Sequence, residues 1–322
     1  MTGAPGSVLM TSAGNKIPLL RAVRAAALRI DPDAKIIAGD LDPDVASRYL
    51  ADGFWVMPEL DTLDLDAIVS ECRRRDIRTI LPTRDGELAF WAAVRPALEA
   101  TGICVIVSRP ESVALCLDKL AFAEWGKTQH LPVIPAAPRP EDFSDPFFVV
   151  KERFGAGSRS IGLGLSPADA RRHATRLVEP LFQPLIEGPE ISVDAWLTAA
   201  GTVHGLVLRR RDRVVNGESQ TTTTFGDPTL EAQAAGVLER LGLSGPVVMQ
   251  AIVTQRGLAV IEVNARFGGA STASLPVGLD MLYWSLFERA WPDAPLPAFD
   301  RLRGEIRQVR VPEDIVIRDP DL

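Results

Sequence analysis

The sequence predicts an α/β protein whose C-terminal part changes to an α+β arrangement. Over roughly the first 110 residues, short apolar runs alternate with segments of helical periodicity, which is the order typical of a parallel sheet. Residues 132–146 then carry five prolines, and these predict an irregular connector into a new unit. From residue 181 onward, strand-like runs joined by short turns dominate, as expected for the α+β part.

The first part can be assigned element by element. Strands are expected at residues 7–12, 35–38, 53–57, 79–81 and 103–107, and helices at 17–30, 64–75 and 87–100. The turn after the first strand holds a single glycine, Gly14, whereas a dinucleotide fingerprint needs more glycines. The sequence therefore argues against a nicotinamide-binding protein, and it offers no candidate site for hydride transfer.

The second part begins with a strand at residues 147–151 and contains one clear helix at 230–241. A last strand is expected within residues 304–311, after a proline-rich stretch.

Composition narrows the class of protein. The chain has 322 residues, 46% hydrophobic and 24% charged, so a soluble globular protein of two or three subdomains is expected. A net charge of −7, with no dense basic run beyond residues 73–75 and 209–211, argues against a nucleic-acid partner. No segment has the pattern of an export signal or the length and apolarity of a membrane span, so no membrane partner is expected.

The three cysteines, Cys72, Cys104 and Cys116, lie in apolar or helical surroundings without paired spacing. Such cysteines are typical of buried free thiols. We therefore expect a protein of the reducing cytoplasm.

A row of polar residues stands out at residues 258–269, an apolar run that contains Glu262, Asn264 and Arg266 two residues apart. In an extended strand these three side chains share one face. The intervening apolar side chains are expected to face the core: Ile261, Val263 and Ala265.

A second strand is expected at residues 246–254, separated from the polar row by the three-residue loop Gln255-Arg256-Gly257. A hairpin centred on Arg256 places Gln250 opposite Glu262, with Cβ atoms roughly 4.5–5.5 Å apart. The side-chain oxygens of Gln250, Glu262 and Asn264 are hard ligands, which suit Mg²⁺ bound together with substrate phosphates. The neighbouring guanidinium of Arg266 can neutralise a phosphoryl group. An exposed hairpin face with ordinary polar residues is the alternative on these residues alone.

A glycine-rich segment follows the strand that ends at Lys151, and residues 155–159 read Gly-Ala-Gly-Ser-Arg. Glycines let backbone N–H groups converge on an anion, and the serine and arginine add a donor and a charge. No Gly-Lys-Ser/Thr follows, so this is not the phosphate loop of helix-starting NTPases. A mobile hairpin tip is the competing interpretation.

Residues 183–194 form an extended apolar segment with carboxylates near its end. Its backbone can offer donors and acceptors to an adenine edge, and a carboxylate can accept from ribose hydroxyls. Taken alone, it is also an ordinary strand, turn and strand.

In their order along the chain, these motifs resemble the ATP-grasp superfamily, and within it the stand-alone ligases that are similar to the carbamoyl phosphate synthase large subunit. The resemblance rests on Asp118-Lys119, Lys151 with the glycine loop, residues 183–190, Gln250, and Glu262-x-Asn264-x-Arg266. It extends through residues 11–14, 81–88, 217–219 and 264–269. It implies a parallel α/β pre-ATP-grasp domain at residues 1–112, an ATP-grasp lid or small subdomain at 113–186, and a catalytic subdomain at 187–322.

The resemblance also implies ATP and Mg²⁺ as cofactors, with Mn²⁺ as a substitute, and assigns the nucleotide site. The residues expected at the phosphates are Lys119, Lys151 and a lid loop that includes Gly155, Gly157, Ser158 and Arg159. Gln183, Leu185 and Ile186 are expected to line the adenine pocket, and Glu190 to bind the ribose.

For the reaction centre, the resemblance implies that Mg²⁺ is held by Gln250, Glu262 and Asn264 and that Arg266 steadies the transferred phosphoryl group. In relatives the segment around Arg209 and Arg211 approaches the acyl substrate, so either arginine is expected to bind a carboxylate. A solvated basic strand is the alternative. The chain departs from close relatives here, since residues 221–224 are threonines in place of a lysine-containing stretch.

The function implied is an ATP-dependent carboxylate–amine ligase. An amino-acid-like carboxylate is phosphorylated to an acylphosphate, and an amine then displaces phosphate. The expected partners are thus small-molecule carboxylate and amine substrates, and a homodimer is expected only at the family level. One alternative is phosphorylation of bicarbonate or carbamate, although the chain has a single grasp unit and no glutamine-hydrolysing domain. Another is a non-catalytic nucleotide sensor, against which the intact metal and arginine set argues.

Overall fold

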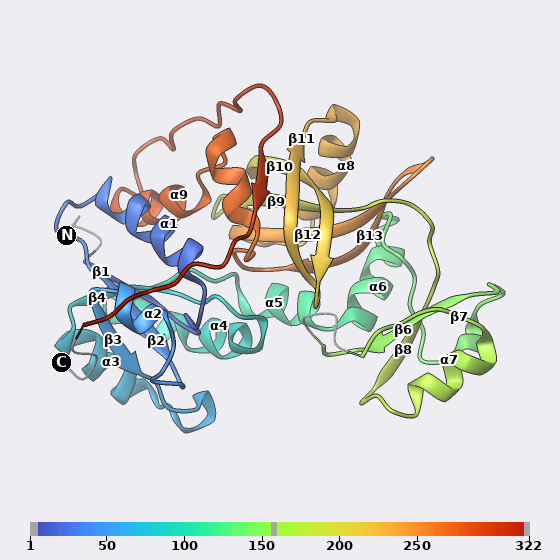
Figure 1. Cartoon of the computed structure of the whole chain (residues 1–322), viewed down its shortest axis with the longest axis horizontal. Coiled ribbons are helices and arrows are strands. Elements are labelled where there is room, and N and C mark those ends of the chain that lie inside the picture. Colours follow the sequence, from blue (N-terminus) through green and yellow to red (C-terminus); the bar gives the residue numbers. More distant parts are fainter. Residues whose placement is uncertain (1–5, 156–159, 319–322) are drawn as a thin grey trace.

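The computed structural model describes residues 6–155 and 160–318, and it is built around three sheets (Figure 1). A five-stranded parallel sheet forms the N-terminal domain, and a three-stranded antiparallel sheet forms a small domain at the opposite end. A six-stranded antiparallel sheet lies between them. The predicted change from α/β to α+β is confirmed. Gly157, Ser158 and Arg159, expected in the lid loop, lie outside the described residues.

The N-terminal sheet has the strand order β3-β2-β1-β4-β5. Its strands are β1 (Ser7–Met10), β2 (Ile36–Asp40), β3 (Gly53–Val56), β4 (Ile77–Leu81) and β5 (Cys104–Val105). Its helices are α1 (Ile17–Leu28), α2 (Ser47–Leu50), α3 (Leu65–Arg74) and α4 (Asp85–Ala100), with a 3-10 turn at Leu60–Thr62. The strands and helices expected from the alternating pattern are all present. Helix α3, for example, begins after Asp64, whose carboxylate accepts a hydrogen bond from Ala67 N at 2.7 Å and so caps the first turn.

Two helices, α5 (Pro110–Leu117) and α6 (Lys119–Thr128), lead out of this domain. The proline-rich connector that follows contains a 3-10 turn at Pro140–Asp142. Its backbone pairs with both neighbouring sheets, through Val133 with Val260 and through Ala137 with Phe182. The connector therefore ties the small domain to the central sheet.

The small domain consists of β6 (Phe148–Glu152), β7 (Gly162–Leu165), α7 (Pro167–Ala174) and β8 (Pro180–Pro184). Strand β6 lies in the middle of this sheet, between β7 and β8. The helix covers a small core around Phe148, Val150, Ala170 and Phe182.

The central sheet has the order β13-β12-β9-β10-β11-β14. Its strands are β9 (Glu190–Leu197), β10 (Val203–Val215), β11 (Glu218–Phe225), β12 (Gly245–Thr254), β13 (Gly257–Asn264) and β14 (Arg307–Val309). Helices α8 (Pro228–Leu238) and α9 (Met281–Ala290) and a 3-10 segment at Ser271–Val277 complete this part. The final strand expected within residues 304–311 is thus present as β14.

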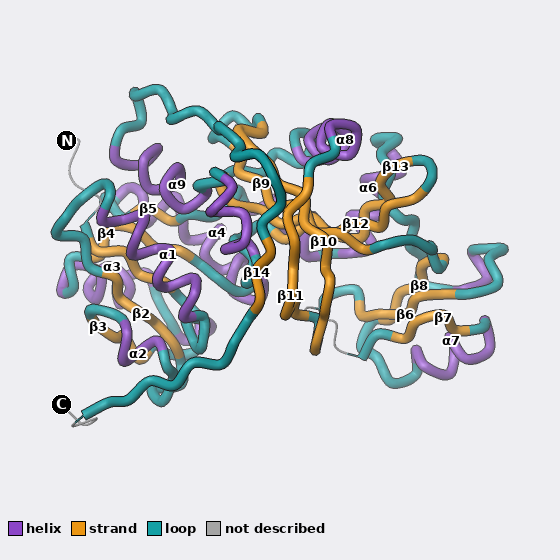
Figure 2. The backbone as a smooth tube through the Cα atoms, turned by 45° about the horizontal axis from the view of Figure 1, so that its top comes forward, coloured by secondary structure: helices purple, strands orange, loops and turns teal. Residues whose placement is uncertain are grey.

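The alternation of side chains along β9 divides the central sheet into two buried faces. Ile191, Val193 and Ala195 belong to a core that α8 covers and that continues into the N-terminal domain. Trp196 faces the other side, in a core with residues of α1 and α9, two helices that lie beside each other in both views (Figures 1 and 2). Both faces of the sheet are therefore tied to the N-terminal domain.

The chain after β14 runs back toward the N-terminal domain (Figure 1). There Glu313 accepts two hydrogen bonds of 2.8 Å from Arg21 of α1. No helix in the described part of the chain has the length and apolarity needed to cross a bilayer.

The cysteines are buried and free, as predicted. Burial raises the pKa of Cys72, Cys104 and Cys116 to about 12 in each case. These thiols therefore remain protonated and are poor nucleophiles.

Candidate active site

The hairpin of β12 and β13 places Gln250 opposite Glu262, as the sequence predicts, but by a different route. The predicted three-residue loop is wrong, because Thr254 pairs directly with Gly257 and leaves a two-residue turn. The register then shifts, since Ala251 pairs with Val260 and Gln250 with Glu262. One extra residue in β13 therefore restores the expected pairing through a β-bulge.

The extra residue is Ile261, and it changes which side chains face the core. Leu258 and Val260 are buried before the bulge, and Val263 and Ala265 are buried after it. Ile261 is only half-buried and lies outside that core. The expectation that Ile261 faces the core is wrong, because a bulge interrupts the two-residue alternation of a strand.

Glu262 and Asn264 remain on one face, half-buried, together with Gln250. Asn264 Nδ2 donates to Glu262 Oε1 over 3.5 Å. In the orientation that satisfies its amide, Gln250 donates to Glu262 Oε1 at 2.9 Å and accepts from Arg211 Nη1 at 3.1 Å. The three expected metal ligands and Arg211 thus form one cluster.

This cluster offers oxygen donors that suit Mg²⁺, namely one carboxylate and two side-chain amides. A single carboxylate supplies one negative charge, so oxygens of a nucleotide would have to complete the coordination. Among residues 6–155 and 160–318, no group of three or more His, Cys, Asp and Glu could hold a metal by itself. The donor set therefore fits a metal that arrives with a phosphate ligand.

Two lysines approach the cluster from outside the central sheet. Lys119, the first residue of α6, has its Nζ 3.9 Å from Glu262 Oε2 and also donates to the carbonyl of Gly155. Lys151 in β6 is 5% exposed. Burial is the main reason that its pKa falls to about 8; Lys119 lowers it further, while Glu262 and Glu190 raise it.

The end of β6 is fixed against the start of α6. Asp118 caps the helix through Leu120 N at 3.1 Å and Ala121 N at 3.0 Å. It also accepts from Arg153 at 2.8 and 2.6 Å, and this pairing lowers the pKa of its carboxyl group. These contacts hold the two lysine-bearing elements side by side.

The segment expected at the adenine lies at the junction of the small domain and the central sheet. Gln183 is buried, and its Nε2 donates to Ile134 O at 3.2 Å. Leu185 and Ile186 are half-buried, and Leu185 N donates to Phe147 O at 2.9 Å.

The turn that follows packs closely on β12. A Cβ at Gly188 would lie 2.3 Å from Val253 O and 2.8 Å from Ile252 Cγ2, so only glycine fits there. The turn leads to Glu190, whose carboxylate is exposed and pairs with Arg211.

Ile252 is a residue of this region that sequence reasoning missed. It is two residues from Gln250 in β12, so both side chains share one face, and it lies against the 186–190 turn. The sequence did carry a signal for Ile252, because the second residue after Gln250 in a strand faces the same side.

Arg209 and Arg211 differ sharply in their surroundings. Arg209 is 2% exposed and binds Asp194, itself 0% exposed, at 2.6 and 2.8 Å. Asp194 also accepts from Ser271 at 2.6 Å and from Ser274. Arg209 is therefore enclosed with a structural partner, whereas Arg211 contacts Glu190 and Gln250 at the cluster.

Arg266 extends the row of polar residues toward the N-terminal domain. Its Nη2 donates to Asp85 Oδ2 at 2.5 Å, and its Nη1 to Phe267 O at 3.3 Å. Asp85 stands in the first turn of α4 and is 8% exposed. The residue expected at the phosphoryl group is therefore held from the other domain.

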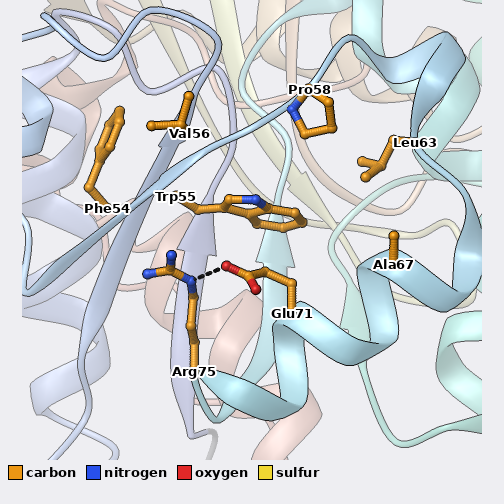
Figure 3. Close-up of a pocket in the computed structure, with 8 residues that line it drawn as sticks. All are labelled: Phe54, Trp55, Val56, Pro58, Leu63, Ala67, Glu71 and Arg75. Carbon is orange, nitrogen blue, oxygen red and sulfur yellow. Dashed lines mark hydrogen bonds and ion pairs between the residues drawn. The ribbon is translucent and has the colours of Figure 1, made fainter.

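A separate hollow of about 450 Å³ lies in the N-terminal domain, between β3 and α3 (Figure 3). Trp55 crosses it, and the ion pair of Glu71 with Arg75 lies at one side (Figure 3). None of the residues assigned to the candidate site lines it.

Two family models match the chain. Residues 176–302 match a family described as "ATP-grasp in the biosynthetic pathway with Ter operon", and residues 8–106 match the "PylC-like, N-terminal domain". The chain therefore carries an ATP-grasp domain over residues 176–302 and a PylC-like N-terminal domain over residues 8–106. By sequence, no curated protein matches the chain.

Solved structures share the fold over most of the chain. The biotin carboxylase domain of Hydrogenobacter thermophilus 2-oxoglutarate carboxylase has a TM-score of 0.72 and 18% identity, over 92% of this chain and 73% of that one. N5-carboxyaminoimidazole ribonucleotide synthetase from Thermus thermophilus has a TM-score of 0.70 and 16% identity, over 93% and 82%. L-amino acid ligase from Bacillus licheniformis has a TM-score of 0.67 and 15% identity, over 89% and 75%. At these identities the similarity shows the fold.

Proposed function

We propose that the chain is an ATP-dependent carboxylate–amine ligase that releases ADP and phosphate. The observation that carries this proposal is the convergence of two lysines with the polar row. Lys119 Nζ lies 3.9 Å from Glu262, and Lys151 is close enough for its pKa to respond to both. Buried cations beside a hard-oxygen cluster suit a metal-bound polyphosphate. Among the proteins of the same fold are enzymes whose names denote carboxylation or amino acid ligation.

In this proposal the nucleotide lies between the small domain and the central sheet. Lys119 and Lys151 bind its phosphates under a lid loop that begins at Gly155. The loop residues Gly157, Ser158 and Arg159 keep their expected role as phosphate ligands, although they lie outside the described part of the chain. Gln183, Leu185 and Ile186 surround the adenine, with Glu190 at the ribose.

Gln250, Glu262 and Asn264 are the proposed ligands of Mg²⁺, or of Mn²⁺ in its place. The metal, when bound, neutralises phosphate charge at the reacting centre. The chain's own contribution is to hold these oxygens and the two lysines in fixed positions, which is how enzymes of phosphoryl transfer lower the barrier.

Two displacements then complete the reaction. A carboxylate oxygen of the first substrate attacks the γ-phosphorus of ATP, and the bond to the β-phosphate oxygen breaks, which gives an acylphosphate and ADP. The unprotonated nitrogen of the amine attacks the acyl carbon, the bond to the phosphate oxygen breaks, and the leaving phosphate takes up the proton that the nitrogen gives up. Arg266 faces the negative charge of the transferred group. No protein nucleophile is needed.

Of the two arginines considered for the substrate, Arg211 is the better candidate, because it contacts Gln250 and Glu190. The guanidinium of Arg209 is not available to a substrate, because it is hydrogen-bonded to Asp194. We propose that Arg209 instead supports the residues after Arg266, because Ser271 joins Asp194 at 2.6 Å to the backbone N–H of Gly268 at 3.1 Å.

The same proposal includes three functional parts: residues 1–112, a small or lid subdomain at 113–186 and a catalytic subdomain at 187–322. It also includes a cytoplasmic setting, supported by the free thiols, and assembly as a homodimer, which rests on the family alone.

Trapping of the acylphosphate tests this function. With MgATP, hydroxylamine and a panel of carboxylic and amino acids, the purified chain should form one acyl hydroxamate and equimolar ADP. The Glu262→Ala variant is the blank. ATP cleavage to AMP and pyrophosphate, or tight ATP binding with no hydroxamate from any acid, would contradict the proposal.

A further inference from the structure

The last strand of the central sheet, β14, brings a further arginine to the candidate site. This strand pairs with β11 at the edge of the sheet (Figure 2). The pairing continues one residue beyond the strand, since Arg310 N donates to Gln220 O at 2.8 Å. Arg310 has no part in the reaction proposed above.

The side chains of β14 alternate between the two faces of the sheet. Arg307 donates to a threonine of β11 on one face. Gln308 points the other way, where it accepts from Thr272 Oγ1 at 2.9 Å. Arg310 is two residues after Gln308, so it is expected on the same face as Gln308, beside the segment that follows Arg266.

A close contact agrees with this position of Arg310. Its Nη2 lies only 2.9 Å from the place that a Cβ at Gly269 would take, so the glycine lets the guanidinium approach the backbone. Gly269 is exposed, and it is the third residue after Arg266. Their Cα atoms can therefore be at most about 11 Å apart. Arg310 thus contacts the same loop that carries the residue proposed to face the phosphoryl group.

Arg310 is also linked to Arg211 through the turn before β11. Arg211 Nη2 donates to Gly217 O at 2.7 Å, and Arg310 Nη1 donates to Glu218 Oε2 at 2.5 Å. The two guanidinium groups therefore bind consecutive residues of the chain. Together with Arg266, they place three arginines around one part of the candidate site.

The three arginines differ in how many hydrogen-bond donors they have left. Every nitrogen of the Arg211 side chain donates to a protein acceptor, and Arg266 donates to Asp85 and to a backbone carbonyl. The Arg310 side chain is 26% exposed, and within residues 6–155 and 160–318 only its Nη1 has an acceptor. Its Nε and Nη2 therefore remain available as one edge of the guanidinium.

A free edge of this kind fits a carboxylate, which accepts two parallel hydrogen bonds from an arginine. The chain itself contains an example, since Asp194 binds Nε and Nη2 of Arg209 at 2.6 and 2.8 Å. Glu218 is 64% exposed, so solvent screens its charge at Arg310. A phosphate group carries a charge of about −1.5 to −2 and would need more cations than one edge of Arg310 supplies.

We propose that the acid substrate is a dicarboxylic acid, and that Arg310 binds the carboxylate that is not phosphorylated. The reacting carboxylate lies toward Arg266 and Arg211, and the second carboxylate lies on the Nε and Nη2 edge of Arg310. Acidic amino acids and simple diacids both belong to this class. The inference rests on the ligase function proposed above, and it makes Arg310 a residue that determines the specificity for the acid.

Isothermal titration of the full chain with MgADP present tests this inference through binding alone. The probes are succinate, glutarate, L-aspartate and L-glutamate, and each is compared with its monoamides, which keep a single carboxylate. At least one dicarboxylic acid should bind, and its monoamides should bind about 10-fold more weakly, which corresponds to one charge-assisted contact.

Variants assign this preference to Arg310. In Arg310→Met the dicarboxylic acid and its monoamides should bind within about 2-fold of each other, and Arg310→Lys should keep part of the preference, because it keeps the charge without the planar edge. Arg307→Met is the matched control, since it removes an arginine from the same strand on the opposite face, and it should keep the full preference. Thermal melting checks that each variant is folded.

Glu218→Gln separates substrate binding from a purely structural ion pair. It removes the charge of the partner of Arg310 but leaves the Nε and Nη2 edge in place, so the preference for the dicarboxylic acid should remain. In the hydroxamate assay, Arg310→Met should raise the KM for the dicarboxylic acid about 10-fold and keep kcat within about 2-fold, since it removes a contact away from the reacting group.

The outcomes distinguish this inference from the ligase proposal. Loss of the preference in Arg310→Met, without hydroxamate from any acid, would contradict the ligase and leave the Arg310 site standing. Hydroxamate from monocarboxylic acids alone would leave the ligase standing and overturn the role of Arg310. That role is also overturned if the wild type binds MgADP but none of the acids, if every dicarboxylic acid binds like its monoamides, or if Arg310→Met keeps the wild-type preference.

Discussion

Arg266 Nη2 donates to Asp85 Oδ2 at 2.5 Å, which joins the residues just after β13 to the first turn of α4 across 181 positions of sequence. The pair crosses from the ATP-grasp sheet to the N-terminal domain, and both side chains are mostly buried. The position of the Arg266 guanidinium thus depends on the N-terminal domain, to which the proposed function assigns no nucleotide-binding residue.

Asp85→Asn is expected to lower kcat by about 10–100-fold, since a misplaced charge-stabilising group costs that much or more. The Kd for ATP should stay within about 2-fold, because the ion pair of Asp85 is with Arg266, whereas that of Lys119 is with Glu262. Asp85→Glu should recover part of the rate. Steady-state kinetics with ATP titration measures both quantities, and a drop in ATP affinity with unchanged kcat would contradict the role given to this pair.

Lys151→Ala is expected to weaken ATP binding and slow the chemical step together, because the lysine is a buried cation at the proposed phosphate site. A loss of about 10–100-fold in kcat/KM for ATP is the expected size for one charged contact. The control is Lys127→Ala, which removes a largely exposed lysine at the far end of α6. Unchanged values for Lys151→Ala would remove this residue from the site.

Arg209→Met is expected to reduce stability, whereas Arg211→Met is expected mainly to reduce binding. Asp194 is 0% exposed, so loss of Arg209 leaves a buried carboxylate and should lower the free energy of unfolding by about 3–5 kcal/mol. Glu190 is 41% exposed, so loss of Arg211 leaves a solvated carboxylate and should cost far less stability, while it weakens nucleotide or substrate binding. Urea unfolding together with kinetics of both variants checks the contrast, and equal stability losses would refute it.

Lys16 should make stability rise with pH. Its pKa is about 8 in the folded chain against 10.5 in its ordinary state, so between these values the unfolded chain binds one more proton than the folded chain. The free energy of unfolding therefore increases with pH through this window. Relative to Lys16→Met, the wild type should gain about 3 kcal/mol from pH 8 to pH 10.5. Urea unfolding of both proteins across this pH range measures the difference. The same pH dependence of the free energy of unfolding in the wild type and in Lys16→Met would contradict a lowered pKa of Lys16.

The sequence predicted the fold and the facing pair of Gln250 and Glu262, because alternation along strands is a local property of sequence. The pairing was right although the loop length was wrong, since the two-residue turn and the bulge at Ile261 compensate each other. A bulge leaves no distinct signature in a single sequence.

The contrast between Arg209 and Arg211 was beyond sequence alternation, which places both arginines on one face of β10. What separates them is Asp194 in the neighbouring strand and two serines from residues 271–274. The pair of Asp85 and Arg266 was equally out of reach, because no local pattern relates residues that meet only through the packing of two domains.

The central claim is that MgATP drives the joining of an acid to an amine at Glu262 and its neighbours. Its most direct test is release of phosphate and ADP by the purified chain with single amino acids, with pairs of amino acids, and with bicarbonate plus ammonia, in parallel with Glu262→Ala. The account predicts equimolar ADP and phosphate with a particular acid–amine pair, and a loss of about 100-fold or more in a Glu262→Ala variant that melts like the wild type. Equal activity in that variant, release only with bicarbonate and ammonia, or bound ATP without turnover for any pair would contradict it.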